Sequence, residues 1–316
     1  MKTHRVIIVG GGPAGSTCGG RLHRAGVDCL ILDQFVFPRP KTCAGWITPR
    51  VLEDLNIDPD VYPHGLSRYH SLQIYFKGFP FRRPGKQYAV RREEFDAWLL
   101  ERSGTPVETH RVRQIIQNKQ GFELDGKYRA DILVGAGGTH CPVYHQFFKG
   151  VLPRTGGKIA ALEEELKHPW EDGQPRLWFF ENELPGYSWY LPKADGWINL
   201  GVGGDQAVMK ERGRDIRNYW DHLINKLIRK GWAPRRTYQP EGYVYHLRGK
   251  EDHVCRDSVY LVGDAAGLAT RDMGEGIGPA VASGLRAADS ILTGEPYSLE
   301  GLEKFSLLPG WLGRLV

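Results

Sequence analysis

A glycine-rich turn near the start of the chain has the residue types and spacing of a nucleotide-binding loop. It follows a β-branched run at residues 6–9 and precedes a helix-compatible stretch that reaches about Ala25. In such a unit the first glycine allows a tight turn, the second lets the backbone approach a pyrophosphate, and the third lets the helix pack on the strand. The candidate cofactor-binding residues of this turn are Gly10, Gly12, Pro13, Ala14 and Gly15.

An acidic residue stands where a dinucleotide would present its ribose. Asp33 ends a second apolar strand that begins at Cys29, and it follows Gly15 at about the separation typical of an acid that accepts from ribose hydroxyls. The neighbouring Gln34 and Arg39 are further cofactor-binding candidates. An ordinary strand–helix–strand unit with a glycine-rich turn is the alternative interpretation, and this unit alone does not separate FAD from NAD.

A second candidate site lies near the C-terminal end of the sequence. Asp264 follows Gly263 at the end of an apolar strand over residues 258–262, where its carboxylate can accept from polyol hydroxyls. A glycine cluster then opens a helix that reaches about Leu292, and a helix N-terminus favours a developing negative charge. The candidate residues of this cluster are Gly274, Gly276 and Ile277. A second strand–turn–helix crossover with an ordinary cap is the alternative.

Three further residues are candidates for catalysis. Tyr187 and Trp189 are two positions apart in an extended segment, so both rings lie on one sheet face. They either line an apolar slot or pack a β core; Gly186 and Pro192 favour an edge strand, which suits the slot. Cys43 is either a proton donor beside a cofactor or a buried, inert thiol.

These motifs together resemble the p-hydroxybenzoate-hydroxylase-like FAD superfamily, and within it the geranylgeranyl reductase family. Residues 263–284 (GDAAGLATRDMGEGIGPAVASG) resemble its flavin-ribityl motif, and residues 185–192 resemble PxxYxWxFP with Leu191 in place of Phe. The resemblance implies that the cofactor is FAD, that Asp264 contacts the ribityl chain, and that residues 274–278 lie beside the isoalloxazine.

Three shorter segments carry the same resemblance. The Lys-x-Cys-Gly-Gly segment that lies over the flavin in the family corresponds to Cys43, Ala44 and Gly45, with Ala44 in place of a glycine. Its RxxFD stretch implies that Arg92 approaches the FAD phosphates, although an exposed charged helix face is the alternative. Its Gly-Ala-Asp-Gly turn keeps Ala136 but has Gly137 in place of the Asp, where glycine would suit a strained turn. Since that Asp is thought to serve reduced-nicotinamide binding in the hydroxylases, we expect poor direct use of NADPH.

The elements that position these residues predict an α/β (α+β) fold with two domains. A discontinuous Rossmann-like FAD-binding domain is expected at residues 1–66, 88–155 and 253–316, with an inserted, mostly antiparallel substrate domain at 67–87 and 156–252. Strands are expected within 69–82 and 176–204, one amphipathic helix over 210–230, and the site between the domains.

Composition excludes several other classes of protein. The chain has 316 residues, and 42 basic against 37 acidic residues give a net charge of +5 without clustering, which argues against nucleic-acid binding. Five cysteines without a CxxC pair fit neither a metal site nor a disulfide framework and favour a reducing, cytoplasmic location. No apolar run is long enough to span a membrane. The apolar tail at 307–312 is expected to cover the cavity, touch a membrane surface or pack on another subunit.

The function we expect is an FAD-dependent reduction of a C=C bond in a prenyl or other apolar small-molecule or lipid substrate. Hydride would leave the reduced flavin, and the proton would come from Cys43, Tyr187 or water. The electron donor would be a ferredoxin-like protein or NAD(P)H, and peripheral membrane contact stays open. An FAD-dependent monooxygenase on an aromatic or polyketide-like substrate is the alternative, and a non-catalytic flavin-binding protein is a third class.

Overall fold

The computed structural model describes residues 1–249 and 254–306, and the chain forms two compact units. The first unit comprises residues 1–39, 93–156 and 246–316, and the second comprises 40–92 and 157–245. The apolar tail at 307–312 lies outside the described residues.

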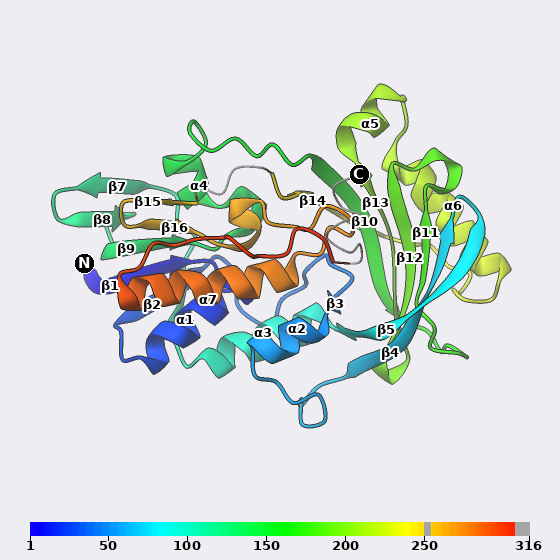
Figure 1. Cartoon of the computed structure of the whole chain (residues 1–316), viewed down its shortest axis with the longest axis horizontal. Helices are drawn as coiled ribbons and strands as arrows, with labels where there is room; N and C mark the ends of the chain where they lie inside the picture. The colour runs from blue at the N-terminus through cyan, green and yellow to red at the C-terminus, as the bar shows by residue number, and fades with distance from the viewer. Residues whose placement is uncertain (250–253, 307–316) are drawn as a thin grey trace. The chain divides into compact units, whose positions relative to one another are not determined.

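The first unit is built on a largely parallel sheet in the order β15-β16-β9-β1-β2-β6, with the β7–β8 hairpin added beside β9 (Figure 1). Its strands are β1 (Lys2–Val9), β2 (Cys29–Asp33), β6 (Val107–Thr109), β7 (Ile115–Asn118), β8 (Gly121–Leu124), β9 (Tyr128–Gly135), β15 (Cys255–Arg256) and β16 (Val259–Leu261). Its helices are α1 (Pro13–Arg24), α3 (Arg92–Ser103, the first residue belonging to the second unit), α4 (Pro142–Phe147) and α7 (Ile277–Thr293).

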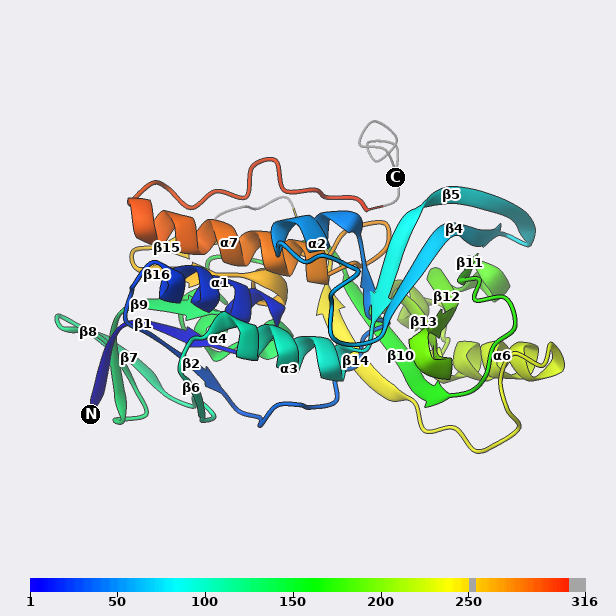
Figure 2. The same ribbon diagram turned by 90° about the horizontal axis from the view of Figure 1, so that it is seen from below.

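Both faces of this parallel sheet are buried, as the unbroken apolar run of β1 predicts. Val6 and Ile8 pack under the helices with Leu22 of α1, whereas Ile7 packs on the opposite face with Tyr144 of α4. Figure 2 shows α1 between α3 and α7 on the same side of the sheet. Helices α1 and α7 lie very close, because a Cβ at Gly284 would stand 2.5 Å from the Ala14 carbonyl oxygen.

The second unit is built on another sheet, in the order β14-β10-β13-β12-β11-β4-β5-β3. The pairs β10–β13, β13–β12, β12–β11, β4–β5 and β5–β3 are antiparallel, whereas β11 runs parallel to β4. Its strands are β3 (Trp46–Ile47), β4 (Leu66–Phe76), β5 (Phe79–Val90), β10 (Lys158–Lys167), β11 (Arg176–Phe179), β12 (Gly186–Lys193), β13 (Trp197–Asp205) and β14 (Glu241–His246). Its helices are α2 (Pro49–Asp54), α5 (Gln206–Glu211) and α6 (Ile216–Arg229).

The two faces of this second sheet differ in chemistry. The face under α6 is apolar and contains Leu162, Leu200 and Val202 among its core residues. Because side chains alternate along a strand, the neighbouring positions Glu163 and Gly201 belong to the opposite face. The architecture confirms the expected combination of a nucleotide-binding α/β fold with a mostly antiparallel second sheet.

The structure corrects two details of the expected elements. The single helix expected over 210–230 is two helices, α5 and α6, because Gly213 adopts a left-handed φ of 62° and Asp215 caps α6. In this capping box the Asp215 amide also donates to the Asn218 side-chain oxygen. Residues 40–66 lie in the second unit and not in the nucleotide-binding part, because β3 pairs with β5.

Two further expectations concern cysteines and membranes. All five cysteines are described and none is in a disulfide. Among the described residues no helix is both long and apolar enough to cross a bilayer.

Candidate functional site

The glycine turn of the first unit has two tightly packed glycines and one open glycine. Gly10 has a φ of 116°, and a Cβ there would stand 2.4 Å from the Ala136 carbonyl oxygen. A Cβ on Gly15 would stand 1.9 Å from the Gly10 carbonyl oxygen. At Gly12, by contrast, the nearest atom to such a Cβ is the Arg39 Nη2, 3.8 Å away. The turn therefore packs through Gly10 and Gly15 and leaves the approach to Gly12 clear.

Asp33 is hydrogen-bonded to the glycine turn. Its buried carboxylate accepts from the Gly11 amide at 2.7 Å through Oδ2 and from the Phe35 amide at 2.9 Å through Oδ1. Each oxygen retains a lone pair for a ribose hydroxyl, so the structural and the binding roles are compatible. Gln34 beside it is exposed.

Arg39 lies next to the turn and is held in place. Its guanidinium is 3.7 Å from Asp96, whose carboxylate is fully buried, and it lies 4.7 Å from the centre of the Phe37 ring. Asp96 follows Phe95 in the stretch that contains Arg92, but the sequence did not single it out. The cation is thus oriented near the open side of Gly12, where a phosphate would sit.

The second motif packs against the first. A Cβ at Gly263, whose φ is 60°, would stand 3.1 Å from Ala14 Cβ, and one at Gly276 would stand 3.2 Å from Asp264 Oδ1. Gly12 caps α1 and Gly276 caps α7, and neither glycine has a side chain to cap its helix. Two helix N-termini near two acids fit the pyrophosphate and polyol of a flavin dinucleotide.

In the turn after β9, the left-handed backbone conformation is not at Gly137, where a strained turn was expected. Gly137 has an ordinary φ of −78°, so it does not need to be glycine for conformational reasons. The left-handed conformation falls on Gly138, with a φ of 71°. A side chain at Gly137 would instead meet the Cys141 Cα at 3.2 Å, so crowding is what favours the small residue there.

The sequence analysis does not single out Glu275, a partly buried carboxyl just before α7. Glu275 accepts from the Gly278 amide at 2.6 Å. Burial raises the pKa of the Glu275 carboxyl to about 7, and Glu303 and Asp272 act in the same direction. Glu275 lies between Gly274 and Gly276, and nothing in this local pattern indicates that its pKa is raised.

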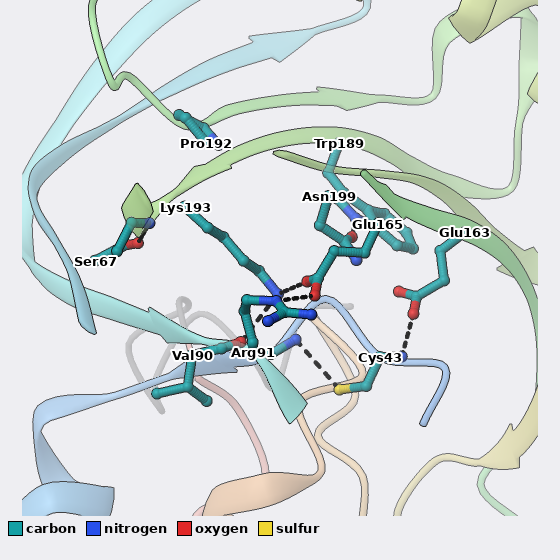
Figure 3. Close-up of polar contacts among 12 residues, drawn as sticks. Cys43, Ser67, Val90, Arg91, Glu163, Glu165, Trp189, Pro192, Lys193 and Asn199 are labelled. Atoms are coloured by element: carbon teal, nitrogen blue, oxygen red, sulfur yellow. Dashed lines mark hydrogen bonds and ion pairs between the residues drawn. The ribbon is translucent and has the colours of Figure 1, made fainter. Parts of the chain in front are cut away.

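The second unit contains a partly buried charged cluster that we call the Lys193 cluster, formed by Arg91, Glu163, Glu165, Lys193 and Asn199 (Figure 3). Lys193 is 1% exposed and donates to the Val90 carbonyl oxygen at 2.9 Å and to Glu165. Arg91 donates to the other oxygen of Glu165 at 2.9 Å. Glu165 is therefore shared by two cations, which leaves Glu163 as the less neutralised carboxyl.

Glu163 connects the Lys193 cluster to Cys43. Its carboxyl accepts from the Cys43 backbone amide. Burial raises the pKa of Glu163 to about 7, although Lys193, the Cys43 amide and Asn199 oppose the rise. A carboxyl with such a pKa changes charge near neutral pH, directly beside the Cys43 backbone.

The Cys43 segment itself is tightly constrained. Gly45 donates its amide to Cys43 Sγ at 3.4 Å. Gly45 has a φ of 71°, and a Cβ there would stand 2.0 Å from the Val90 carbonyl oxygen, so both conformation and space require glycine. Cys43 is half-buried, as is Ala44, whereas Cys18 and Cys141 are buried. Its thiol is therefore partly accessible.

Tyr187 and Trp189 share a face, but not on an edge strand. β12 pairs with β11 on one side and with β13 on the other, so the expectation of an edge strand was wrong. The Trp189 indole is 8% exposed, donates to Asn199 Oδ1 at 2.7 Å, and lies 2.0 Å from where a Cβ of Gly201 would be. The Tyr187 ring is half-buried and 5.7 Å from Trp189.

The expected site residues thus divide between the units. The first unit gathers both glycine motifs with Asp33, Arg39, Ala136, Gly137 and Asp264, while Ile277 is buried at the start of α7. The second unit contains Cys43, Ala44, Gly45, Tyr187, Trp189 and the buried Arg92. No cluster of three or more metal-ligating side chains occurs among residues 1–249 and 254–306.

The chain is similar to known flavoproteins over most of its length. An FAD binding domain model matches residues 3–68. A digeranylgeranylglycerophospholipid reductase of Methanopyrus kandleri is 28% identical over 300 residues, covering 83% of this chain and 70% of that protein. A menaquinone reductase of Mycolicibacterium smegmatis is 25% identical over 322 residues, covering 92% and 76%.

A solved structure has the same fold. A geranylgeranyl bacteriochlorophyll reductase-like protein of Thermoplasma acidophilum superimposes with a TM-score of 0.79 at 22% identity, covering 95% of this chain and 81% of that one. Together these matches confirm the resemblance inferred from the sequence motifs. The cofactor is FAD, and the chain is an oxidoreductase that depends on it.

Proposed function

We propose that this FAD-dependent oxidoreductase of the geranylgeranyl reductase family reduces C=C bonds in the prenyl chain of a lipid or a similarly apolar molecule. The reductases to which it is similar carry names that refer to prenyl lipids and to a quinone. The observation that carries the proposal is the half-buried Cys43, held by Glu163 on the same sheet face as Tyr187 and Trp189. That face offers proton-donating groups next to aromatic surface, which is what an alkene reduction requires.

FAD supplies the hydride chemistry when it is bound and reduced. Gly12 and the α1 N-terminus would hold its pyrophosphate, Asp33 its ribose and Asp264 its ribityl chain. Arg39 would contribute positive charge near the phosphates, and the buried Arg92 remains a candidate for the same task. The protein's task is orientation and the exclusion of water.

The second unit would supply the proton. Cys43 and Tyr187 are the candidate donors, with water as the third source. Glu163 accepts from the Cys43 backbone amide, and the Gly45 amide donates to the Cys43 thiol sulfur. Trp189 is held by Asn199 and provides a fixed apolar surface rather than a mobile lid. These residues would place the donor group at a defined position.

The electron donor we propose is a ferredoxin-like protein or NAD(P)H. We expect slow direct reduction by NADPH, since Gly137 replaces the Asp of the hydroxylases. Five unpaired cysteines favour a cytoplasmic site of action, with peripheral contact to a membrane that contains the substrate.

The test is an anaerobic incubation of dithionite-reduced protein with prenyl lipids, followed by lipid mass spectrometry. We expect a gain of two hydrogens per reduced double bond, and less of it with Cys43→Ser. Cys255→Ser is the matched control, because that thiol is also half-buried but lies in the first unit. Product that forms only with oxygen, and carries an added oxygen atom, would show a monooxygenase instead.

A further inference from the structure

The hairpin β4–β5 of the second unit ends in exposed aromatic residues. Phe79 is 78% exposed, Phe81 48% and Phe76 46%, and Phe180 nearby is 42% exposed. Single exposed apolar residues are common, but four phenylalanines on one part of a surface form a patch of the kind that binds a partner or a membrane.

The register shows why these rings gather. Phe76 pairs with Phe79, and Ile74 pairs with Phe81, so all four side chains share one face of the hairpin. Lys77 and Gly78 form the two-residue turn, both with positive φ, which keeps the tip narrow. Phe79 follows the turn directly and therefore lies at the end of the hairpin.

The charges on the hairpin that carries Phe76, Phe79 and Phe81 have one sign, whereas Glu181 and Glu183 follow Phe180. The hairpin sequence from 69 to 90 contains Lys77, Arg82, Arg83 and Lys86 and has no Asp or Glu. Lys77, Arg82 and Lys86 are exposed. Aromatic side chains among basic ones fit the surface of a bilayer with anionic lipids, where the rings enter the headgroup boundary and the cations meet the lipid charge.

A series of ring contacts leads from the hairpin to Trp189. The ring centres are 5.4 Å apart for Phe76 and Phe180, 6.2 Å for Phe180 and Phe179, 5.0 Å for Phe179 and Tyr187, and 5.7 Å for Tyr187 and Trp189. We call these five residues, Phe76, Phe180, Phe179, Tyr187 and Trp189, the aromatic band. It joins the exposed patch to the sheet face that bears Glu163.

We propose that the tip of hairpin β4–β5 docks the protein on an anionic lipid bilayer, with Phe79 and Phe81 inserted among the headgroups. The aromatic band would then lead an apolar chain from the bilayer toward Trp189, a part of the inference that rests on the proposed function. Docking by the hairpin tip brings Phe76, the first residue of the aromatic band, to the membrane. An apolar chain could then leave the bilayer without being exposed to water.

The docking is tested by sedimentation of the full FAD-loaded chain with vesicles of phosphatidylglycerol and phosphatidylcholine, and with vesicles of phosphatidylcholine alone. We expect binding to the anionic vesicles that falls with salt, and a loss of about tenfold in Phe79→Ser, because one inserted Phe ring is removed. Val61→Ser is the matched control, since Val61 is 73% exposed elsewhere in the same unit and should leave vesicle binding unchanged. The melting temperature of both variants should match that of the parent protein.

Unchanged binding by Phe79→Ser, or no binding by the parent protein, would overturn the proposal. So would a dimer in light scattering that Phe79→Ser dissociates without any vesicle binding, because the patch would then contact a second copy. Vesicle binding does not depend on catalysis. A protein that docks through Phe79 but reduces no prenyl lipid therefore leaves the docking intact and refutes only the proposed function.

Discussion

Replacing Glu163 with glutamine tests whether this carboxyl is neutral in the folded protein. In the unfolded chain a glutamate ionises at its ordinary pKa of 4.5, whereas burial keeps Glu163 protonated up to about pH 7. Between these two values folding takes up a proton, so the stability contributed by this group falls as pH rises from 4.5 to about 7. Below 4.5 the contribution is at its maximum, and above about 7 the loss is complete.

The size of the effect follows from the pKa. A shift of about 2.5 pH units at about 1.36 kcal/mol each corresponds to roughly 3 kcal/mol. The glutamine side chain of the variant keeps an oxygen for the Cys43 amide but cannot ionise. We therefore expect Glu163→Gln to match the parent protein near pH 4.5 and to be more stable by roughly 3 kcal/mol at pH 8. In melting temperature this is on the order of 5–10 °C.

The assay is thermal or urea unfolding of both proteins across pH 4.5–8. Glu275 also has a raised pKa, but it is present in both proteins and cancels in the difference. Glu165→Gln is the contrasting variant, because removing the carboxylate between Lys193 and Arg91 leaves buried positive charge and should destabilise at every pH. A Glu163→Gln difference that does not vary with pH would show that the carboxyl is ionised in the fold and refute the reasoning.

Three other predictions follow from the two units. Asp264→Ala should weaken FAD binding about ten- to a hundredfold with the fold intact, measured by flavin titration; an unchanged dissociation constant would make Asp264 a turn residue only. Trp189→Ala should lower the free energy of unfolding in urea by about 3–5 kcal/mol, because the indole is buried and packs against Gly201. Tyr187→Ala should lower turnover with little loss of stability. A larger loss of stability in Tyr187→Ala than in Trp189→Ala would contradict the packing. NADPH alone should reduce the bound flavin slowly, and rapid anaerobic bleaching of the flavin absorbance would disprove the inference from Gly137.

The sequence determined the two glycine motifs of the nucleotide-binding part of this protein. Gly10, Gly12 and Gly15 lie within one strand–turn–helix unit, and Asp33 ends the next strand, so their relation is set by local chain geometry. The same holds for Asp264, which follows β16, and for Gly276, which caps α7. Local patterns of this kind can be read without knowing the fold, and FAD as the cofactor is confirmed.

Predictions from local sequence patterns were wrong where a helix cap or the pairing of distant strands determines the structure. The helix expected over 210–230 is interrupted at Gly213 because Asp215 caps a new helix. The strand with Tyr187 and Trp189 was expected at an edge from its flanking Gly186 and Pro192, yet β11 and β13 pair with it on both sides. The number of neighbours of a strand depends on the topology of the whole sheet, which the strand's own residues do not encode.

Only the tertiary structure revealed the Lys193 cluster. Glu163 and Glu165 of β10, Lys193 of β12 and Asn199 of β13 meet because of the registers of β10 with β13 and of β12 with β13. A shift of one residue in either register would put a side chain on the opposite face, and the sequence alone does not fix the register between strands so far apart in the chain. Burial of Glu163, and with it the pKa near 7 beside Cys43, is therefore a property of the assembled sheet.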